Sequence, residues 1–217
     1  MSRPPLTPVR VIDAASRVAD ATGLAGVSMR SVGRELGVEA MSLYHHVANK
    51  DALLDGLADW VFAQILTPSL GVPWRYEMEA RARSARSVLA AHPWGLGLVE
   101  SRRSAGPATL RHHDAVLGCL RTDGFTVALA AHTFSVLDAY TYGFVLTEVN
   151  LPFEPGTADE FIEEIAASLA DRPWMSELVA ERITGQDYAY GDEFEYGLAL
   201  ILDGLEAAFE EEVRGRS

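Results

Sequence analysis

The segment from Val27 to Leu54 constrains this chain more than any other part of its sequence, because it predicts two short helices joined by a tight turn. Ser28 is a good helix N-cap, and Val32 and Leu36, four residues apart, give the first helix one inward apolar edge. Gly37 then ends that helix, since glycine adopts a left-handed backbone at little cost. A second helical run follows within a few residues. This spacing is typical of helix-turn-helix geometry.

The second short helix has small and polar side chains on the side that does not pack. Val38, Leu43 and Val47 can pack back onto the rest of the domain. We expect the other face to enter a major groove, where small residues allow close approach and Met41 can contact a thymine methyl group. That face consists of Glu39, Ala40, Met41, Ser42, Tyr44, His45 and His46.

Helix caps predict one further helix before the helix-turn-helix segment and one after it. Asn49 is a predicted N-cap for a further helix that begins at Lys50, the only lysine of the chain. The free N–H groups at a helix start favour a phosphate, and Lys50 adds a full positive charge. An earlier helix has Thr7 as its N-cap, Pro8 in its first turn, where the missing N–H costs nothing, and Gly23 at its end. The sequence therefore predicts a three-helix unit followed by a connector helix.

The distribution of charge confines contact with DNA to that unit. Residues 1–50 contain six Arg or Lys against four Asp or Glu, a net charge of +2. Residues 51–217 contain twelve against twenty-seven, a net charge of −15, which brings the whole chain to −13. Because the acidic body repels DNA, we expect modest and strongly salt-dependent non-specific affinity.

Residues 7–59 resemble the DNA-binding domain of the tetracycline-repressor (TetR) family, above all in the run LYHHVANKDALLDGL from Leu43 to Leu57. The resemblance implies a homodimeric, ligand-responsive transcriptional regulator, usually a repressor, that binds a double-stranded DNA operator. It also implies that the residues matching the family's operator contacts bind DNA here, the arginine among them by forking onto a guanine. Those residues are Ser28, Met29, Arg30, Glu39, Ala40, Met41, Ser42, Tyr44, His45, His46 and Lys50.

The rest of the chain alternates helical blocks with glycine and proline and shows no strand-like pattern. We therefore predict an all-α fold with a helix-turn-helix domain at residues 1–49, a connector helix at 50–66 and a helical ligand-binding and dimerisation domain at 67–217. Two blocks stand out: residues 126–148 are apolar on most faces, more than a monomer can bury, and residues 194–209 carry one broad apolar stripe backed by glutamates.

These two blocks resemble the C-terminal domain of tetracycline-repressor-type members, in which the corresponding helices of two subunits form a four-helix interface. The segment ILDGLEA, Ile201 to Ala207, and the segment HPWG, His92 to Gly95, belong to the same pattern. The resemblance therefore implies a homodimer through helices 126–148 and 194–209. Small residues such as Gly143, Gly197 and Gly204 would allow close helix approach, although packing within one subunit is an equal alternative.

The same resemblance implies a cavity for a small-molecule effector among the helices of the second domain. Such sites are apolar chambers with a few polar groups. Asp138 is the polar candidate, because a carboxylate buried without a partner would be costly. Ordinary core packing is the alternative for the other candidates. The candidates are Arg81, Trp94, Val116, Leu120, Phe134, Leu137, Asp138 and Tyr142.

This chain differs from the family members that bind magnesium-tetracycline at the positions that hold the drug. They hold the drug with an asparagine and a glutamine, where this chain has Arg81 and Val116. They place a histidine and a glutamate around the metal–drug complex, where this chain has Ala139 and Thr147. Since a hard cation needs oxygen or nitrogen ligands that alanine lacks, we expect an effector other than magnesium-tetracycline.

Signals for an enzyme or a metal site are weak. The run RHHD, Arg111 to Asp114, is typical of a solvated helix face, and neighbouring histidines on a helix point apart and chelate poorly. Cys119 is the single cysteine, and its apolar surroundings predict a buried small hydrophobe. We therefore expect no enzymatic activity, no metal and no cofactor.

The sequence leaves two alternatives for function and predicts a cellular location. A helical small-molecule-binding protein or enzyme with a degenerate DNA-binding domain is the alternative function. Activation rather than repression also stays open, since the sign depends on where the operator lies relative to the promoter. The sequence has no apolar run long enough to span a membrane and no leader, which predicts a cytoplasmic protein without a membrane partner.

Overall fold

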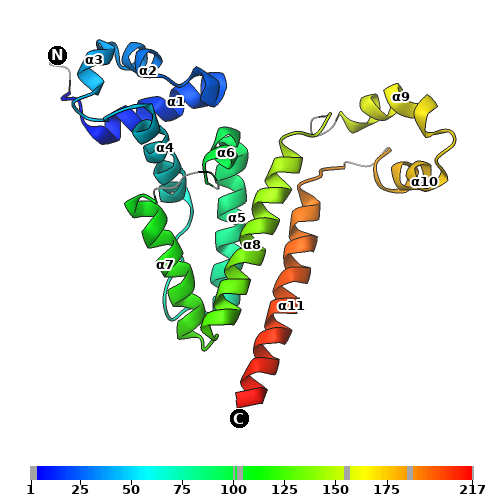
Figure 1. Ribbon diagram of the computed structural model, residues 1–217. Coiled ribbons are helices and arrows are strands. Elements are labelled where there is room, and N and C mark those ends of the chain that lie inside the picture. The colour runs from blue at the N-terminus through cyan, green and yellow to red at the C-terminus, as the bar shows by residue number, and fades with distance from the viewer. Residues whose placement is uncertain (1–3, 100, 102–104, 154–156, 185–187, 217) are drawn as a thin grey trace.

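The computed structural model describes residues 4–99, 101, 105–153, 157–184 and 188–216, and the regular elements in these ranges are all helices (Figure 1). The predicted all-α class is therefore confirmed. None of the described helices is both long enough and apolar enough to cross a membrane. In chain order the elements are α1 (Pro8–Gly26), α2 (Met29–Leu36), α3 (Ala40–Leu43), α4 (Lys50–Gln64), α5 (Trp74–Ala91), the 3-10 helix η1 (Pro93–Gly95), α6 (Leu96–Val99), α7 (Pro107–Thr122), α8 (Val127–Glu148), α9 (Ala158–Leu169), α10 (Pro173–Arg182) and α11 (Asp192–Arg216).

The predicted caps define the helices of the N-terminal part. Gly23, with φ of 67°, interrupts the last turns of α1. At the start of α2, Ser28 accepts a hydrogen bond from the backbone N–H of Ser31, whose hydroxyl in turn accepts one from the backbone N–H of Ser28. This reciprocal capping box fixes where α2 begins. Gly37 ends α2 with φ of 62°, and Asn49 caps α4 by accepting a backbone N–H at 2.8 Å.

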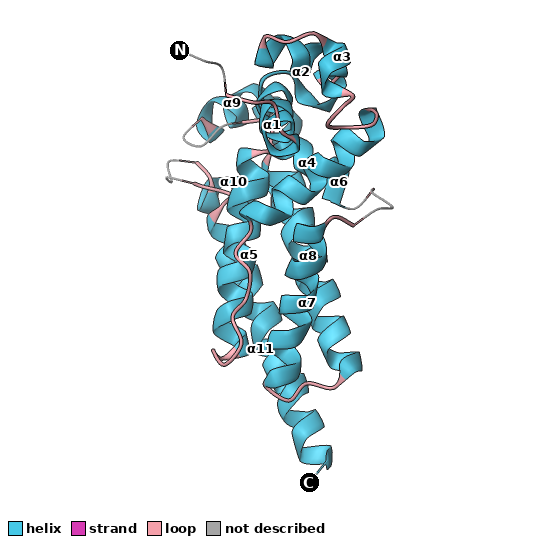
Figure 2. Cartoon of the chain, turned by 90° about the vertical axis from the view of Figure 1, so that its left-hand side faces the viewer, coloured by secondary structure: helices cyan, strands magenta, loops and turns pink. Residues whose placement is uncertain are grey.

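The long helices α5, α7, α8 and α11 pack against one another beneath the N-terminal helices, and α4 leads from one part into the other (Figure 1). Figure 2 shows the same arrangement from the side, with α1 to α3 at one end of the molecule. One buried cluster joins α1 to α4 with parts of α5 and α8, and its members include Leu43, Leu57 and Val145. A second cluster lies among α5, α7, α8 and α11. The first cluster therefore includes buried residues of both parts of the molecule.

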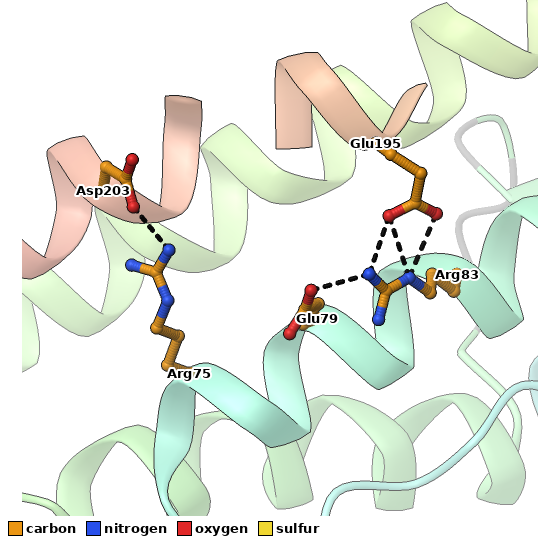
Figure 3. A network of polar contacts seen from close by, with 5 residues as sticks. All are labelled: Arg75, Glu79, Arg83, Glu195 and Asp203. Atoms are coloured by element: carbon orange, nitrogen blue, oxygen red, sulfur yellow. Dashed lines mark hydrogen bonds and ion pairs between the residues drawn. The ribbon is translucent and has the colours of Figure 1, made fainter. Parts of the chain in front are cut away.

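Ion pairs on the surface fix α5 against α11 (Figure 3). Arg75 contacts Asp203 at 2.5 Å, and Arg83 contacts both Glu195 and Glu79 at 2.7 Å. These groups are largely exposed, so each pair contributes at most about 1 kcal/mol. Glu79 and Arg83 both belong to α5, so the pairs with Asp203 and Glu195 are the ones that join the two helices.

The last helix is longer than its apolar block suggests. The sequence predicts a helix at residues 194–209, whereas α11 runs from Asp192 to Arg216. Acidic side chains occupy its first turn and Arg214 and Arg216 its last, which is the favourable arrangement for the helix dipole. The extension is therefore stabilised by charge at both ends rather than by burial.

Candidate DNA-binding surface and ligand pocket

Gly33 determines how closely α2 and α3 approach each other. A Cβ atom at this position would lie 2.9 Å from the carbonyl oxygen of Val38 and 3.3 Å from the Cα atom of Ala40. Any larger residue would therefore push the two helices apart. Leu43 is fully buried, Val47 is buried and Val38 is half-buried against the same cluster, as the sequence predicts.

The residues expected on the outer face of α3 are at least partly accessible. Met41 is 73% exposed and Tyr44 is 46% exposed. The remaining candidates differ in degree, since Arg30, Glu39, His45 and Lys50 are exposed whereas Ser28, Ala40, Ser42 and His46 are half-buried. A surface that combines small, aromatic and basic groups in this way is suited to a nucleic-acid groove.

Met29 differs from this pattern. Its side chain is 7% exposed and packs in the first buried cluster, because its position in the first turn of α2 faces α1. The expectation that the Met29 side chain contacts DNA is therefore corrected.

A pocket of about 680 Å³ opens between α6 and α8. Its volume lies within the range of small-molecule sites. Three of the predicted ligand residues, Phe134, Asp138 and Tyr142, line it. The full lining comprises Leu96, Gly97, Phe134, Ser135, Asp138, Ala139, Tyr142, Gly143 and Leu146.

Behind the pocket wall, Arg81 holds Asp138. The Nη2 atom of Arg81 donates to a carboxylate oxygen of Asp138 at 2.5 Å, and the Tyr142 hydroxyl lies 3.3 Å from the other oxygen. Arg81 is 1% exposed. The expectation that Asp138 must find a partner is therefore confirmed, and Arg81 reaches the pocket through this carboxylate.

His112 corrects another expectation. The run from Arg111 to Asp114 is predicted to be a solvated face, yet His112 is 1% exposed and packs beside Phe62. Its Nε2 atom accepts a hydrogen bond from Nε of Arg81 at 2.9 Å. Burial, aided by the nearby Arg81 charge, lowers the pKa of His112 to about 3. The imidazole is thus neutral, and its buried Nδ1 atom has no hydrogen-bond partner.

Three predicted ligand residues belong to the core instead. Val116, Leu120 and Leu137 are fully buried in the second cluster and do not line the pocket, because their helix faces turn toward Phe125 and α11. Cys119 is also buried there, and burial raises the pKa of its thiol to about 11, as befits a small core residue. The expectation of ordinary packing is therefore correct for this group.

Trp94 lies at the junction with the N-terminal helices rather than in the pocket. Its indole N–H donates to a carboxylate oxygen of Asp20 at 2.6 Å, and Nδ1 of His92 lies 2.7 Å from the same oxygen. We call Asp20, His92 and Trp94 the junction cluster. Leu96 and Gly97, which line the pocket, follow Trp94 closely in the chain. The junction cluster therefore connects the pocket wall directly to α1.

The connector helix is fixed on both sides by adjacent residues. Trp60 donates its indole N–H to Asp13 of α1 at 3.1 Å. Asp59 accepts the backbone N–H of Thr109 at 2.8 Å and so caps the first turn of α7. Trp60 also lies 5.0 Å from His92 between ring centroids, in an edge-on contact. Adjacent residues of α4 therefore contact α7, the segment before η1, and α1.

The outer faces of α8 and α11 carry apolar residues that their own subunit leaves accessible. Tyr196 and Leu200 are exposed on α11, and Leu146 on α8. A Cβ atom added at Gly143 or Gly204 would have no neighbour within 4 Å. Both glycines thus face open space.

The third glycine of this group behaves differently. A Cβ atom at Gly197 would lie 2.2 Å from the Tyr140 hydroxyl, which donates to the carbonyl oxygen of Phe194 at 2.9 Å. Gly197 therefore serves packing between α8 and α11 within the subunit. Packing within one subunit is therefore the correct alternative for Gly197, whereas Gly143 and Gly204 stay predicted positions of close approach in a dimer.

The sequence did not indicate several pocket residues. Ser135 and Leu146 share one face of α8 with Asp138, Ala139 and Tyr142, and this three-to-four residue spacing was the available signal. Leu96 and Gly97 come from a separate short helix and had no local signal. Within the described residues no group of three or more histidine, cysteine or acidic side chains is arranged to hold a metal ion.

Comparison with known proteins identifies the family. Residues 11–57 match the model for bacterial regulatory proteins of the tetR family, and residues 67–209 match the model for the tetracyclin repressor-like C-terminal domain. The HTH-type transcriptional repressor DrrR1 of Streptomyces coeruleorubidus is 36% identical over 94% of this chain and 78% of its own length. The class A tetracycline repressor from transposon 1721 of Escherichia coli is 33% identical over 92% of this chain and 90% of its own.

Solved structures give the same result. Apo ActR from Streptomyces coelicolor is similar with a TM-score of 0.77 and 28% identity, covering 97% of this chain and all of that one. ActR in complex with actinorhodin has a TM-score of 0.74 and 30% identity, over 94% of this chain and 99% of its own. These proteins are transcriptional regulators and not enzymes. The chain belongs to the TetR family of bacterial regulatory proteins.

Proposed function

We propose that this chain is a homodimeric repressor that leaves a palindromic operator when a small molecule other than magnesium-tetracycline occupies the pocket beside α8. The observation that carries the proposal is the junction cluster, which joins the wall of a pocket to a helix of the DNA-binding part. Family membership supports both DNA binding and response to a ligand.

The proposed contacts with DNA come from the exposed side of α2 and α3 and from the start of α4. Tyr44, His45 and Met41 would meet base edges or sugar, while Arg30 and Lys50 would meet a guanine and a phosphate. The accessibility of these side chains supports the assignment. Because one surface reads only one half-site, two copies set about 34–36 Å apart would read a palindrome.

The proposed dimer forms through α8 and α11. Exposed Tyr196, Leu200 and Leu146 supply apolar area, and the open positions at Gly143 and Gly204 allow a second pair of helices to approach closely. The resulting arrangement would also cover the open side of the pocket, since Gly143 and Leu146 belong to its lining.

The proposed switch passes from the pocket to DNA through a short chain of contacts. A ligand that displaces Leu96 or Gly97 moves the segment holding Trp94, and Trp94 is bonded to Asp20 of α1. Two ligands that favour different conformers weaken each other's binding by the same factor. The effector must therefore weaken operator binding by the same factor by which the operator weakens effector binding.

The chemistry of the pocket argues against magnesium-tetracycline. Ala139 lines it where metal-binding members have a histidine, and alanine offers no ligand atom. The relatives include tetracycline repressors, but ActR forms complexes with actinorhodin and with (S)-DNPA, so proteins similar to this chain also bind other effectors.

Selection of duplexes from a random pool by the full-length protein tests the proposal. We expect enrichment of a palindrome whose half-sites lie about 10 base pairs apart, or a multiple of that spacing. The Arg30→Ala variant should lose preference at one position of each half-site. Enrichment of no sequence, or of a single unrepeated half-site, would contradict a dimeric sequence-specific regulator.

A further inference from the structure

The charge of the pocket wall is compensated before any ligand binds. Among the described residues that line the pocket, Asp138 carries the only formal charge at neutral pH. Its side chain is 14% exposed, and one edge of the carboxylate is buried against Arg81. The oxygen on the other edge accepts from the Tyr142 hydroxyl at 3.3 Å and has a second lone pair for a ligand. The buried edge accepts the hydrogen bond from Arg81 at 2.5 Å.

Arg81 contacts both the Asp138 carboxylate and the aromatic ring of Phe134. The guanidinium carbon of Arg81 lies 5.5 Å from the ring centroid of Phe134, which also lines the pocket. A cation at this distance from a ring face is attracted by its quadrupole. The ring thereby holds the positive charge next to the negative one, and the pair is nearly neutral when approached from the pocket.

The two histidines behind the wall add no charge. His112 is kept neutral, with a pKa of about 3, by burial and by Arg81. Burial also lowers the pKa of His113, whose ring lies 5.0 Å from that of Phe134 in an edge-on contact. The whole wall therefore has balanced charge, aromatic surface and one accessible carboxylate edge that can accept a hydrogen bond.

We propose that the effector of this pocket is an uncharged, flat aromatic molecule that donates a hydroxyl to Asp138. This inference rests on the proposed function and names its ligand class. The rings would pack against Phe134 and Tyr142, and about 680 Å³ accommodates three or four fused rings. A ligand of either charge would bring an uncompensated ion against a partly buried ion pair, which is costly.

Arg81 and Asp138 are the specificity-determining residues in this account, because each cancels the charge of the other. Removing Arg81 would leave the pocket with a bare carboxylate and favour a cation. Replacing Asp138 by asparagine would leave the Arg81 charge without its partner and favour an anion. The chemical preference of the pocket should therefore change in opposite directions in the two variants.

Three tricyclic probes of similar size test the proposal by isothermal titration calorimetry of the full-length protein at pH 7. The probes are uncharged 1,4-dihydroxyanthraquinone, anionic anthraquinone-2-sulfonate and cationic proflavine. The wild-type protein should bind the uncharged probe at least about tenfold more tightly than either ion. Tighter binding of either ion, or no binding of 1,4-dihydroxyanthraquinone at micromolar concentrations, would overturn the proposal.

Two variants and a control make the test specific. In Arg81→Met the tightest probe should become proflavine, and in Asp138→Asn it should become anthraquinone-2-sulfonate. The Arg83→Met variant removes an exposed charge on the same helix (Figure 3) and should keep the wild-type order. If Arg81→Met fails to fold, as judged by circular dichroism, the Asp138→Asn and wild-type results still decide. The same order of probes in all folded variants would overturn the proposal.

Operator binding separates this inference from the proposed function. A protein that selects a palindrome but shows no charge preference among the probes would retain the proposed function and lose the ligand class. A protein that selects no DNA sequence would lose the proposed function, while the order of the probes would still report on the pocket.

Discussion

At the scale of single residues, the buried imidazole of His112 makes stability depend on pH. Its pKa is lowered from 6.5 to about 3 by burial and by the charge of Arg81. Between these values the unfolded chain binds a proton that the folded chain rejects, so the free energy of unfolding falls as the pH drops below about 6.5. From pH 7 to pH 5 this loss amounts to roughly 1–2 kcal/mol.

Replacement of His112 tests this dependence. The His112→Gln variant keeps a hydrogen-bond acceptor for Arg81 and removes the titrating group, so its free energy of unfolding should fall less between pH 7 and pH 5 than that of the wild type. Urea unfolding at the two pH values measures the difference. The His132→Gln variant, at an exposed position of α8, is the matched control. Equal losses in His112→Gln and in the control would mean that His112 is not the titrating group.

Lys50 supports a second prediction at this scale. Because it lies exposed at the first position of α4, its charge should meet a phosphate and not a base. The Lys50→Ala variant should bind every duplex more weakly and should lower the salt slope by about one per subunit. Fluorescence anisotropy at several salt concentrations measures both quantities. Arg214→Ala, at the far end of α11, should leave them unchanged, and an altered base preference in Lys50→Ala would mean that Lys50 reads bases.

At the scale of elements, local signals in the sequence predict where helices begin and end. Ser28, Gly37 and Asn49 cap their helices as predicted, because a cap depends on residues three or four positions away. The pairings between elements were not predictable in this way. Arg81 meets Asp138 across 57 positions and Trp94 meets Asp20 across 74, and these contacts depend on which helix faces pack together.

The exposed face of α3 could be predicted from the sequence, because it depends on spacing within one helix. The pocket could be predicted only in part, because it depends on how several helices pack together. Amphipathic spacing around Leu43 indicates the outward side of α3 from a single helix. In the second part nearly every helix is apolar, so spacing does not separate core residues such as Leu120 from lining residues such as Phe134. Met29 fails as a predicted contact because α1 covers it.

The junction cluster leads to a prediction about coupling between elements. The Trp94→Phe variant keeps an aromatic ring and removes the N–H group that bonds Asp20. We expect its pocket to bind 1,4-dihydroxyanthraquinone as the wild type does, while the effect of that probe on operator affinity falls toward none. Anisotropy with and without the probe measures the effect. Trp174→Phe, at an exposed position of α10, is the control, and undiminished coupling in Trp94→Phe would rule out this route.

At the scale of the whole molecule, the open faces of α8 and α11 predict the oligomeric state. Gly143→Leu and Gly204→Leu introduce side chains where the subunit itself has space, so each variant should fold but dimerise poorly. Sedimentation velocity should show a dimer for the wild type and a large monomer fraction for both variants. Gly215→Leu also has open space around it and lies near the end of α11, where it should not disturb the dimer. Unchanged dimers in Gly143→Leu and Gly204→Leu would place the interface elsewhere.

Positive and negative charge are separated between the two parts of the chain. The excess of negative charge after residue 50 should keep the body of the molecule away from DNA, and the positive excess before it should confine contact to one end. The protein should therefore bind tightly only to DNA sequences that fit the recognition surface, and weakly to other DNA.

The most direct test of the central claim is the affinity of the purified protein for DNA from the region upstream of its own gene. Fluorescence anisotropy at two salt concentrations, with a random duplex of equal length as control, supplies the measurement. We predict tight, salt-sensitive binding to the upstream fragment and binding to the random duplex that is weaker by about a thousandfold or more. Equally weak binding to both fragments, together with enrichment of no sequence from the random pool, would contradict the account of this protein as a sequence-specific repressor.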